Sequence, residues 1–116
     1  MTQDQQKNLL MVLAECAAAC DHCAIACLDE PEVKMLTHCI KLDLDCAEIC
    51  RTTASFVARG SSHAKHLLKE CAEICEACGA ECEKHAAHGM EHCRVCAEAC
   101  KRCAVACTQA GADINR

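Results

Sequence analysis

The sequence has almost no aromatic side chains. Phe56 is the single one among 116 residues, and tryptophan and tyrosine are absent. Aromatic rings supply much of the buried surface of ordinary domains, and the large aliphatic side chains of this chain would by themselves make a thin core. Other side chains must therefore fill the middle of the domain.

We expect the sequence to have no basic stripe, no leader and no apolar run of membrane-spanning length. Twelve basic residues stand scattered against 17 acidic ones, and the net charge is −5, so we expect no nucleic-acid partner. Residues 1–6 have neither the basic start nor the apolar run of a signal peptide, and no segment is expected to span a membrane. We predict a cytoplasmic protein, whose thiols stay reduced.

Cysteine, by contrast, is abundant, with sixteen residues. In residues 71–82 the cysteines are spaced alternately by four and three positions, and the same spacing recurs in residues 16–27 and 96–107. Positions with this spacing lie on the face of an α-helix that packs against partner helices. Because a free thiol packs as a small hydrophobe, we expect thiols where other bundles place leucine and isoleucine.

Short breaks divide the chain into four expected helices, at about residues 3–28, 31–59, 62–86 and 89–111. Thr2 or Asp4 can cap the first helix, Pro31 suits the first turn of the second, and Gly60 marks a stop before the third. Near-identical Cys-Ala-Glu-x-Cys segments start at positions 46, 71 and 96. We predict one all-α domain over residues 1–116, an antiparallel up-down-up-down four-helix bundle with a cysteine-lined core.

The inward faces of these helices give the bundle two different ends. The end with both termini is expected to be closed by aliphatic side chains, namely Leu9, Leu13, Val57, Leu68 and Ile114. At the loop end the same faces reach Met35 and His85, which we predict as metal ligands at a mouth. Four further side chains lie beside these faces, where they are either ligands or solvated turn residues: His38, His88, Met90 and His92.

Three ordinary uses of cysteine fit this pattern poorly. Residues at i and i+4 have Cβ atoms about 5–6 Å apart, whereas a disulfide needs about 3.5–4.5 Å, and a cytoplasmic setting opposes disulfides between helices. Packing alone would be served by alanine or valine without the risk of oxidation. Zinc sites use discrete sets of four ligands, and the rows here are continuous.

Two metal chemistries remain. Iron–sulfur proteins carry C-x2-C-x2-C-x3-C-P, close to the C-x3-C-x2-C-x3-C of this chain, although the proline is absent here and the cysteines fall on regular helices. Cu(I) is soft and monovalent, so about one ion per thiolate balances the charge of a dry core. Storage of multiple Cu(I) ions is our leading hypothesis, and an iron–sulfur electron-transfer protein is the alternative.

The Cys-x3-Cys rows on four expected helices resemble those of the copper storage proteins, and the expected absence of a leader resembles their cytosolic branch. The likeness covers nearly the whole chain, with the second helix departing most, at Leu42, Thr53 and Val57. It implies copper sequestration and detoxification without catalysis, a homotetramer of bundles, a copper donor such as a chaperone, and entry at the His- and Met-bearing end. It also implies bridging roles for Cys39 and Cys93 and copper-binding pairs at Cys16/Cys20, Cys23/Cys27, Cys46/Cys50, Cys71/Cys75, Cys78/Cys82, Cys96/Cys100 and Cys103/Cys107.

Overall fold

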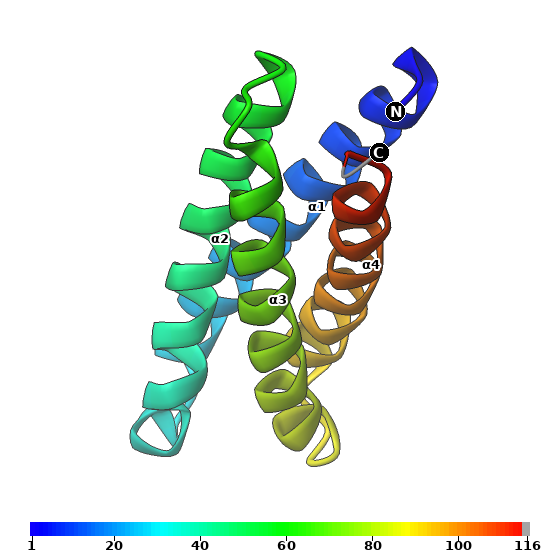
Figure 1. Ribbon diagram of the computed structural model, residues 1–116. Helices are drawn as coiled ribbons and strands as arrows, with labels where there is room; N and C mark the ends of the chain where they lie inside the picture. The colour runs from blue at the N-terminus through cyan, green and yellow to red at the C-terminus, as the bar shows by residue number, and fades with distance from the viewer. Residues whose placement is uncertain (115–116) are drawn as a thin grey trace.

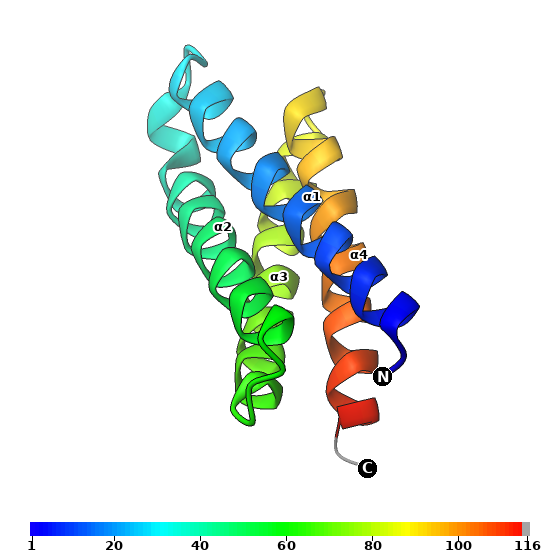
Figure 2. The same cartoon turned by 90° about the horizontal axis from the view of Figure 1, so that it is seen from above.

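The computed structural model describes residues 1–114 and is built from helices. Its elements are α1 (Gln3–Leu28), the short 3-10 helix η1 (Val33–Leu36), α2 (Thr37–Ala58), α3 (Ala64–Ala86) and α4 (Glu91–Ile114). The four long helices run alternately up and down in a bundle 47 Å long, and the start of α1 and the end of α4 lie at the same end as the α2–α3 turn (Figure 1 and Figure 2). Each helix packs on two neighbours, α1 and α3 both lying against α2 and α4. The predicted antiparallel four-helix bundle is confirmed.

The helix ends follow the local sequence signals. The Thr2 hydroxyl accepts the Gln5 N–H at 3.1 Å, and the Gln5 side chain accepts the Thr2 N–H at 2.8 Å, a reciprocal cap that satisfies two free donors. Gly60 and Gly89 have φ of +65° and +91° in the two turns that flank α3, where a side chain would be strained. These three signals therefore set where the helices begin and end.

The second helix begins later than the sequence pattern predicted. Pro31 lies in a turn, residues 33–36 form η1, and α2 starts only at Thr37. The tighter 3-10 turn changes which side chain faces the core, because it advances by three rather than 3.6 residues per turn. Leu36 is fully buried and Met35 is 71% exposed, so the predicted inward placement of Met35 is wrong. The third and fourth helices also start two residues late, and α4 runs on to Ile114 instead of ending near 111.

The core consists of thiols along most of its length and of aliphatic groups at one end. All sixteen cysteines are buried as free thiols. Leu9, Leu13, Val57 and Leu68 are buried near the termini, and Ile114 is partly buried against the core. The predicted aliphatic closure of this end of the bundle is confirmed.

Gly79, inside α3, lies where two helices approach closely. A Cβ at this position would lie 3.3 Å from the Cβ of Cys100 and 3.6 Å from the Ala97 carbonyl oxygen on α4. The glycine therefore brings the thiol rows of α3 and α4 together, at some cost in helix propensity.

Among the described residues, α1 is the one helix long and apolar enough to cross a membrane by length and composition. The expectation that no segment would meet that criterion is thus wrong. The inward face of α1 carries Leu9, Leu13 and four cysteines, all buried in the bundle. This buried face accounts for part of the apolar composition of the helix, while Met11, Ile25 and Leu28 are exposed.

One carboxyl group lies among the thiols. Asp43 is fully buried, at the position the sequence pattern assigned to Leu42, which is only partly buried. Its Oδ1 accepts hydrogen bonds from the thiols of Cys78 at 3.2 Å and Cys96 at 3.3 Å. Burial raises the pKa of Asp43 to about 11. In the metal-free bundle this side chain is therefore a neutral carboxylic acid near neutral pH.

We expect Asp43 to make the metal-free protein less stable as pH rises. In the unfolded chain an aspartate releases its proton near about pH 3.9, whereas the folded state keeps it to about pH 11. Between these values the folded state binds more protons, so the free energy of unfolding falls with rising pH. From about pH 5 to about pH 7.5 the loss due to Asp43 should be on the order of 1–3 kcal/mol.

Urea unfolding of the reduced, metal-free protein at both pH values measures this loss. Asp43→Asn should abolish it, while Asp45→Asn, which removes an exposed carboxylate from the same helix, should leave it in place. The same pH dependence in the parent and in Asp43→Asn would contradict a neutral buried carboxyl.

The reduced, metal-free protein should already be a helical bundle. Its thiols pack as core residues when protonated, and the cap at Thr2 needs no metal. Small zinc domains, by contrast, are unfolded without their ion. Far-ultraviolet circular dichroism in reductant tests this expectation, which a coil spectrum that turns helical only on metal addition would contradict.

Candidate metal centre

Thiols from all four helices meet on the axis of the bundle. Cys16 Sγ of α1 lies 3.8 Å from Cys46 Sγ of α2, 4.0 Å from Cys75 Sγ of α3 and 3.9 Å from Cys100 Sγ of α4. Each helix supplies one member because its inward face recurs every three or four residues. This layer is a set of soft ligands already gathered without a metal.

The layers overlap along the bundle. At least five groups of four thiols have their Sγ atoms within 4.8 Å of one another, and four of these five are linked by shared members, while the group with Cys23 stands apart from them. The groups are Cys16, Cys46, Cys50 and Cys75; Cys16, Cys20, Cys46 and Cys100; Cys20, Cys78, Cys96 and Cys100; Cys23, Cys27, Cys39 and Cys93; and Cys50, Cys71, Cys75 and Cys103. A thiolate that belongs to two groups can bridge two ions. The arrangement is therefore a row for many ions rather than one discrete site.

Several of the predicted Cys-x3-Cys pairs are close within their own helices. The Sγ atoms lie 3.9–4.0 Å apart in four of them: Cys23/Cys27, Cys71/Cys75, Cys96/Cys100 and Cys103/Cys107. Cys39 and Cys93, which have no such partner, make contacts across helices, Cys39 to Cys82 at 3.6 Å and Cys93 to Cys23 at 3.9 Å. This geometry suits the bridging roles implied by the resemblance.

The mouth differs from the sequence-based expectation. Met35 is exposed, and His85 turns its Nε2 to Glu81 Oε2 at 3.0 Å. The neighbouring Lys84 binds the same carboxylate at 3.3 Å, so Glu81 competes with any metal for His85. Met35 and His85 both lie at the loop end, and their role as ligands remains a prediction.

His92 is the histidine that reaches the thiols. Its Nδ1 lies 3.5 Å from Cys93 Sγ, 3.6 Å from Cys23 Sγ and 3.9 Å from Cys27 Sγ. On the other side of the ring, Nε2 is 3.6 Å from Glu30 Oε1 and has no hydrogen-bond partner within residues 1–114. His38 and His88 are exposed, and Met90 is partly buried against the core.

The sequence marks two residues of this site, His92 and Asp43, by their spacing from the cysteines. His92 precedes Cys96 by four residues, the spacing of the cysteine pairs. Asp43 follows Cys39 by four and precedes Cys46 by three, so positions 39, 43, 46 and 50 repeat the spacing of 71, 75, 78 and 82. The inward face of α2 is therefore the same as that of α3, with a carboxyl group in place of one thiol.

Protonation of the thiols keeps the metal-free core free of charge. Burial, and then the nearby Cys39, raises the pKa of the Cys27 thiol to about 11. Ions that bind here must displace protons, and the thiolates so formed are soft donors that select soft cations. A low-coordinate soft cation that tolerates bridging by sulfur is the species this row of thiols fits.

Comparison with known proteins gives one family. The sequence pattern of Csp, the copper storage protein family, matches residues 2–112. A cytosolic copper storage protein from Streptomyces lividans with five coppers is 45% identical, with a TM-score of 0.89 and coverage of 94% of this chain and 93% of the other. Apo copper storage protein 3 from Bacillus subtilis is 39% identical, with a TM-score of 0.81 and coverage of 89% and 95%.

A third relative matches over a shorter segment. The cysteine-rich protein YhjQ of Bacillus subtilis is 42% identical over 53 residues, and the matched segment spans 49% of that relative. The family pattern, in contrast, extends over almost the entire sequence. This chain belongs to the copper storage protein family.

Proposed function

We propose that this protein sequesters and stores multiple Cu(I) ions in its thiol core, for copper storage and detoxification. The overlap of the thiol groups carries the proposal, because it lets bridged ions fill the bundle from layer to layer. Related proteins fit this use: BsCsp3 has been solved in a Cu(I)-bound form, and the Streptomyces lividans protein with 10 copper equivalents. The iron–sulfur alternative is not supported.

The spacing of the sulfurs suits an ion with two or three ligands. Neighbouring Sγ atoms such as those of Cys46 and Cys75 or Cys20 and Cys78 lie 3.6–4.0 Å apart. If the metal–sulfur distance is about 2.3 Å, as for zinc thiolates, this separation corresponds to an S–metal–S angle of about 100–120°. Such angles fit trigonal sites, and a monovalent ion leaves each ion–thiolate pair neutral.

The remaining features of the proposal follow from the family resemblance and from the surface. We propose a single cytoplasmic domain without catalytic activity, which receives copper from a donor such as a chaperone and contacts neither nucleic acid nor membrane. A homotetramer is the proposed assembly. Exposed apolar side chains on the helices, among them Ile25, Leu44 and Val105, are available for contact between copies.

Copper entry is proposed at the loop end. There the imidazole of His92 lies against three thiols, and Glu30 beside it adds a negative charge at the surface. Imidazole holds Cu(I) less firmly than thiolate does, which suits a transfer point. We keep Met35 and His85 as proposed outer ligands, through which an ion passes before it reaches His92 and the sixteen thiolates.

Capacity should be on the order of one Cu(I) per cysteine, from the balance of charge in the buried core. Anaerobic titration with Cu(I) in competition with a chromophoric chelator measures it. Cys16→Ala/Cys46→Ala should lower the capacity, because each thiol belongs to two groups. Saturation of the parent at two or three ions would contradict storage and indicate a discrete site.

Loss of the His92 imidazole should change the rate of Cu(I) loading more than the number of ions bound. We expect His92→Ala to slow loading from a Cu(I) donor about tenfold or more, while capacity falls by about one ion or less. Stopped-flow loading measures the rate, and His22→Ala, an exposed histidine on α1, is the matched control. Met35→Ala/His85→Ala should have a smaller effect in the same direction, because neither side chain reaches a thiol as His92 does.

A His92→Ala variant that loads at the rate of the parent would overturn entry at the loop end. The storage proposal would stand in that case, because the titration measures capacity independently of the route.

A further inference from the structure

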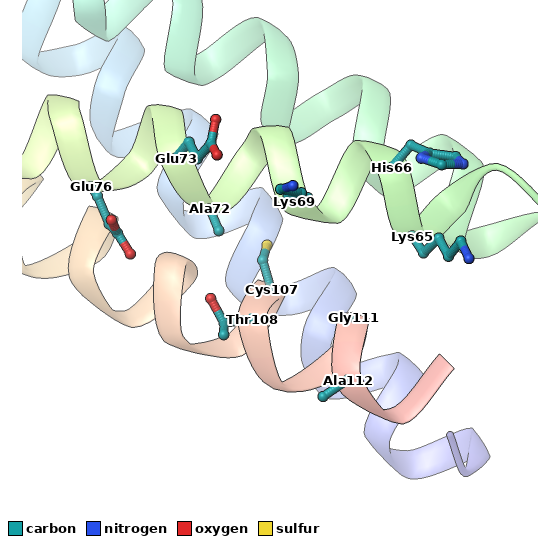
Figure 3. A pocket seen from close by; sticks show the side chains of 10 residues that line it. All are labelled: Lys65, His66, Lys69, Ala72, Glu73, Glu76, Cys107, Thr108, Gly111 and Ala112. Carbon is teal, nitrogen blue, oxygen red and sulfur yellow. The ribbon is translucent and has the colours of Figure 1, made fainter. Parts of the chain in front are cut away.

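A groove opens between α3 and α4 near the end that holds the termini (Figure 3). It encloses about 490 Å³, within the range of about 300–1,000 Å³ found for small-molecule sites. Ala72, Thr108 and Gly111 line it with small side chains, and the sulfur of Cys107 lies between the two helices and faces α3 (Figure 3). The aliphatic groups therefore close this end of the bundle along its axis, whereas the groove approaches the core from the side, between α3 and α4.

Cys107 connects the groove to the row of thiols. Its side chain is 1% exposed, and its Sγ lies 3.9 Å from Cys103 Sγ. Cys103 is in turn 3.9 Å from Cys50 and belongs to a group of four thiols. Because Cys107 itself lines the groove, an ion bound to its sulfur would lie next to the groove, at the end of the bundle opposite His92.

The groove has charge of both signs. Lys65, His66 and Lys69 line it from the first turns of α3, and Glu73 and Glu76 follow along the same helix. Within residues 1–114, these lysines and glutamates form no ion pair. The lysines lie at the N-terminal end of α3, where the helix dipole adds positive potential.

We propose that this groove binds a small thiol that carries carboxylate groups and exchanges Cu(I) with Cys107. This inference rests on the proposed storage function. The carboxylates would pair with Lys65 and Lys69, and an ammonium group on the same molecule would face Glu76. The sulfur between these charged ends would then lie over the small floor of the groove, within reach of an ion on Cys107.

The exchange is a ligand substitution without electron transfer. The incoming sulfur binds Cu(I) as the bond between the ion and Cys107 Sγ breaks. The proton of the incoming thiol passes to the Cys107 sulfur, so charge is conserved and copper remains Cu(I).

Filling the groove tests the proposal without touching a thiol. A Cβ at Gly111 meets no atom within 4 Å, so Gly111→Leu extends a side chain into the groove, and Gly111→Ala is the matched control for helix propensity. The probe is glutathione, added to the copper-loaded protein under anaerobic conditions with a chromophoric chelator to report released ions. We expect a saturable rate that Gly111→Leu slows at least about tenfold and Gly111→Ala leaves near the parent value.

Recognition of carboxylates has its own test. Lys65→Gln/Lys69→Gln should raise the half-saturating concentration of glutathione about fivefold and leave the rate with uncharged 2-mercaptoethanol unchanged. A glutathione rate that increases linearly with concentration and is equal in the parent and Gly111→Leu would overturn the groove as the exchange site. Equal effects of the lysine changes on both thiols would overturn carboxylate recognition. Copper capacity, titrated separately, shows whether storage itself has failed.

Discussion

The structure depends on keeping ligand groups neutral in a dry core until a cation replaces their protons. Sixteen thiolates at separations of 3.6–4.0 Å would repel one another strongly in a low-dielectric interior. As protonated thiols they pack like small hydrophobes and donate weak hydrogen bonds to one another. The same side chains therefore fill the core when it is empty and bind metal when it is loaded, so the bundle needs no separate binding loop.

Asp43 shows how far this neutrality extends. A carboxylate in this position would be an uncompensated charge in the middle of the bundle, and burial shifts its equilibrium toward the acid. It accepts hydrogen bonds from thiols of α3 and α4, so it links three helices. It occupies the position on α2 where the spacing of the cysteines would place another thiol. Asp43 therefore adds one carboxyl group, protonated in the metal-free bundle, to a core lined mostly by sulfur.

The two ends of the bundle differ because their side chains have different affinities for water and for metal. The loop end has imidazole and carboxylate groups at the surface with thiols directly below. The terminal end is closed along the axis by leucine and valine, and a lateral groove there reaches Cys107. Uptake and release can therefore use separate places on the molecule.

The sequence by itself determined the helical bundle, its polarity and the inward position of the thiols, because a spacing of four and three residues is a local property of an α-helix. The tertiary structure decided what happens where the helices end. The 3-10 turn after Pro31 buried Leu36 and exposed Met35, and the His85 imidazole pairs with the Glu81 carboxylate. Whether His92 or His85 faces the core depends on how helices from distant parts of the chain meet, and spacing within one helix carries no information about that contact.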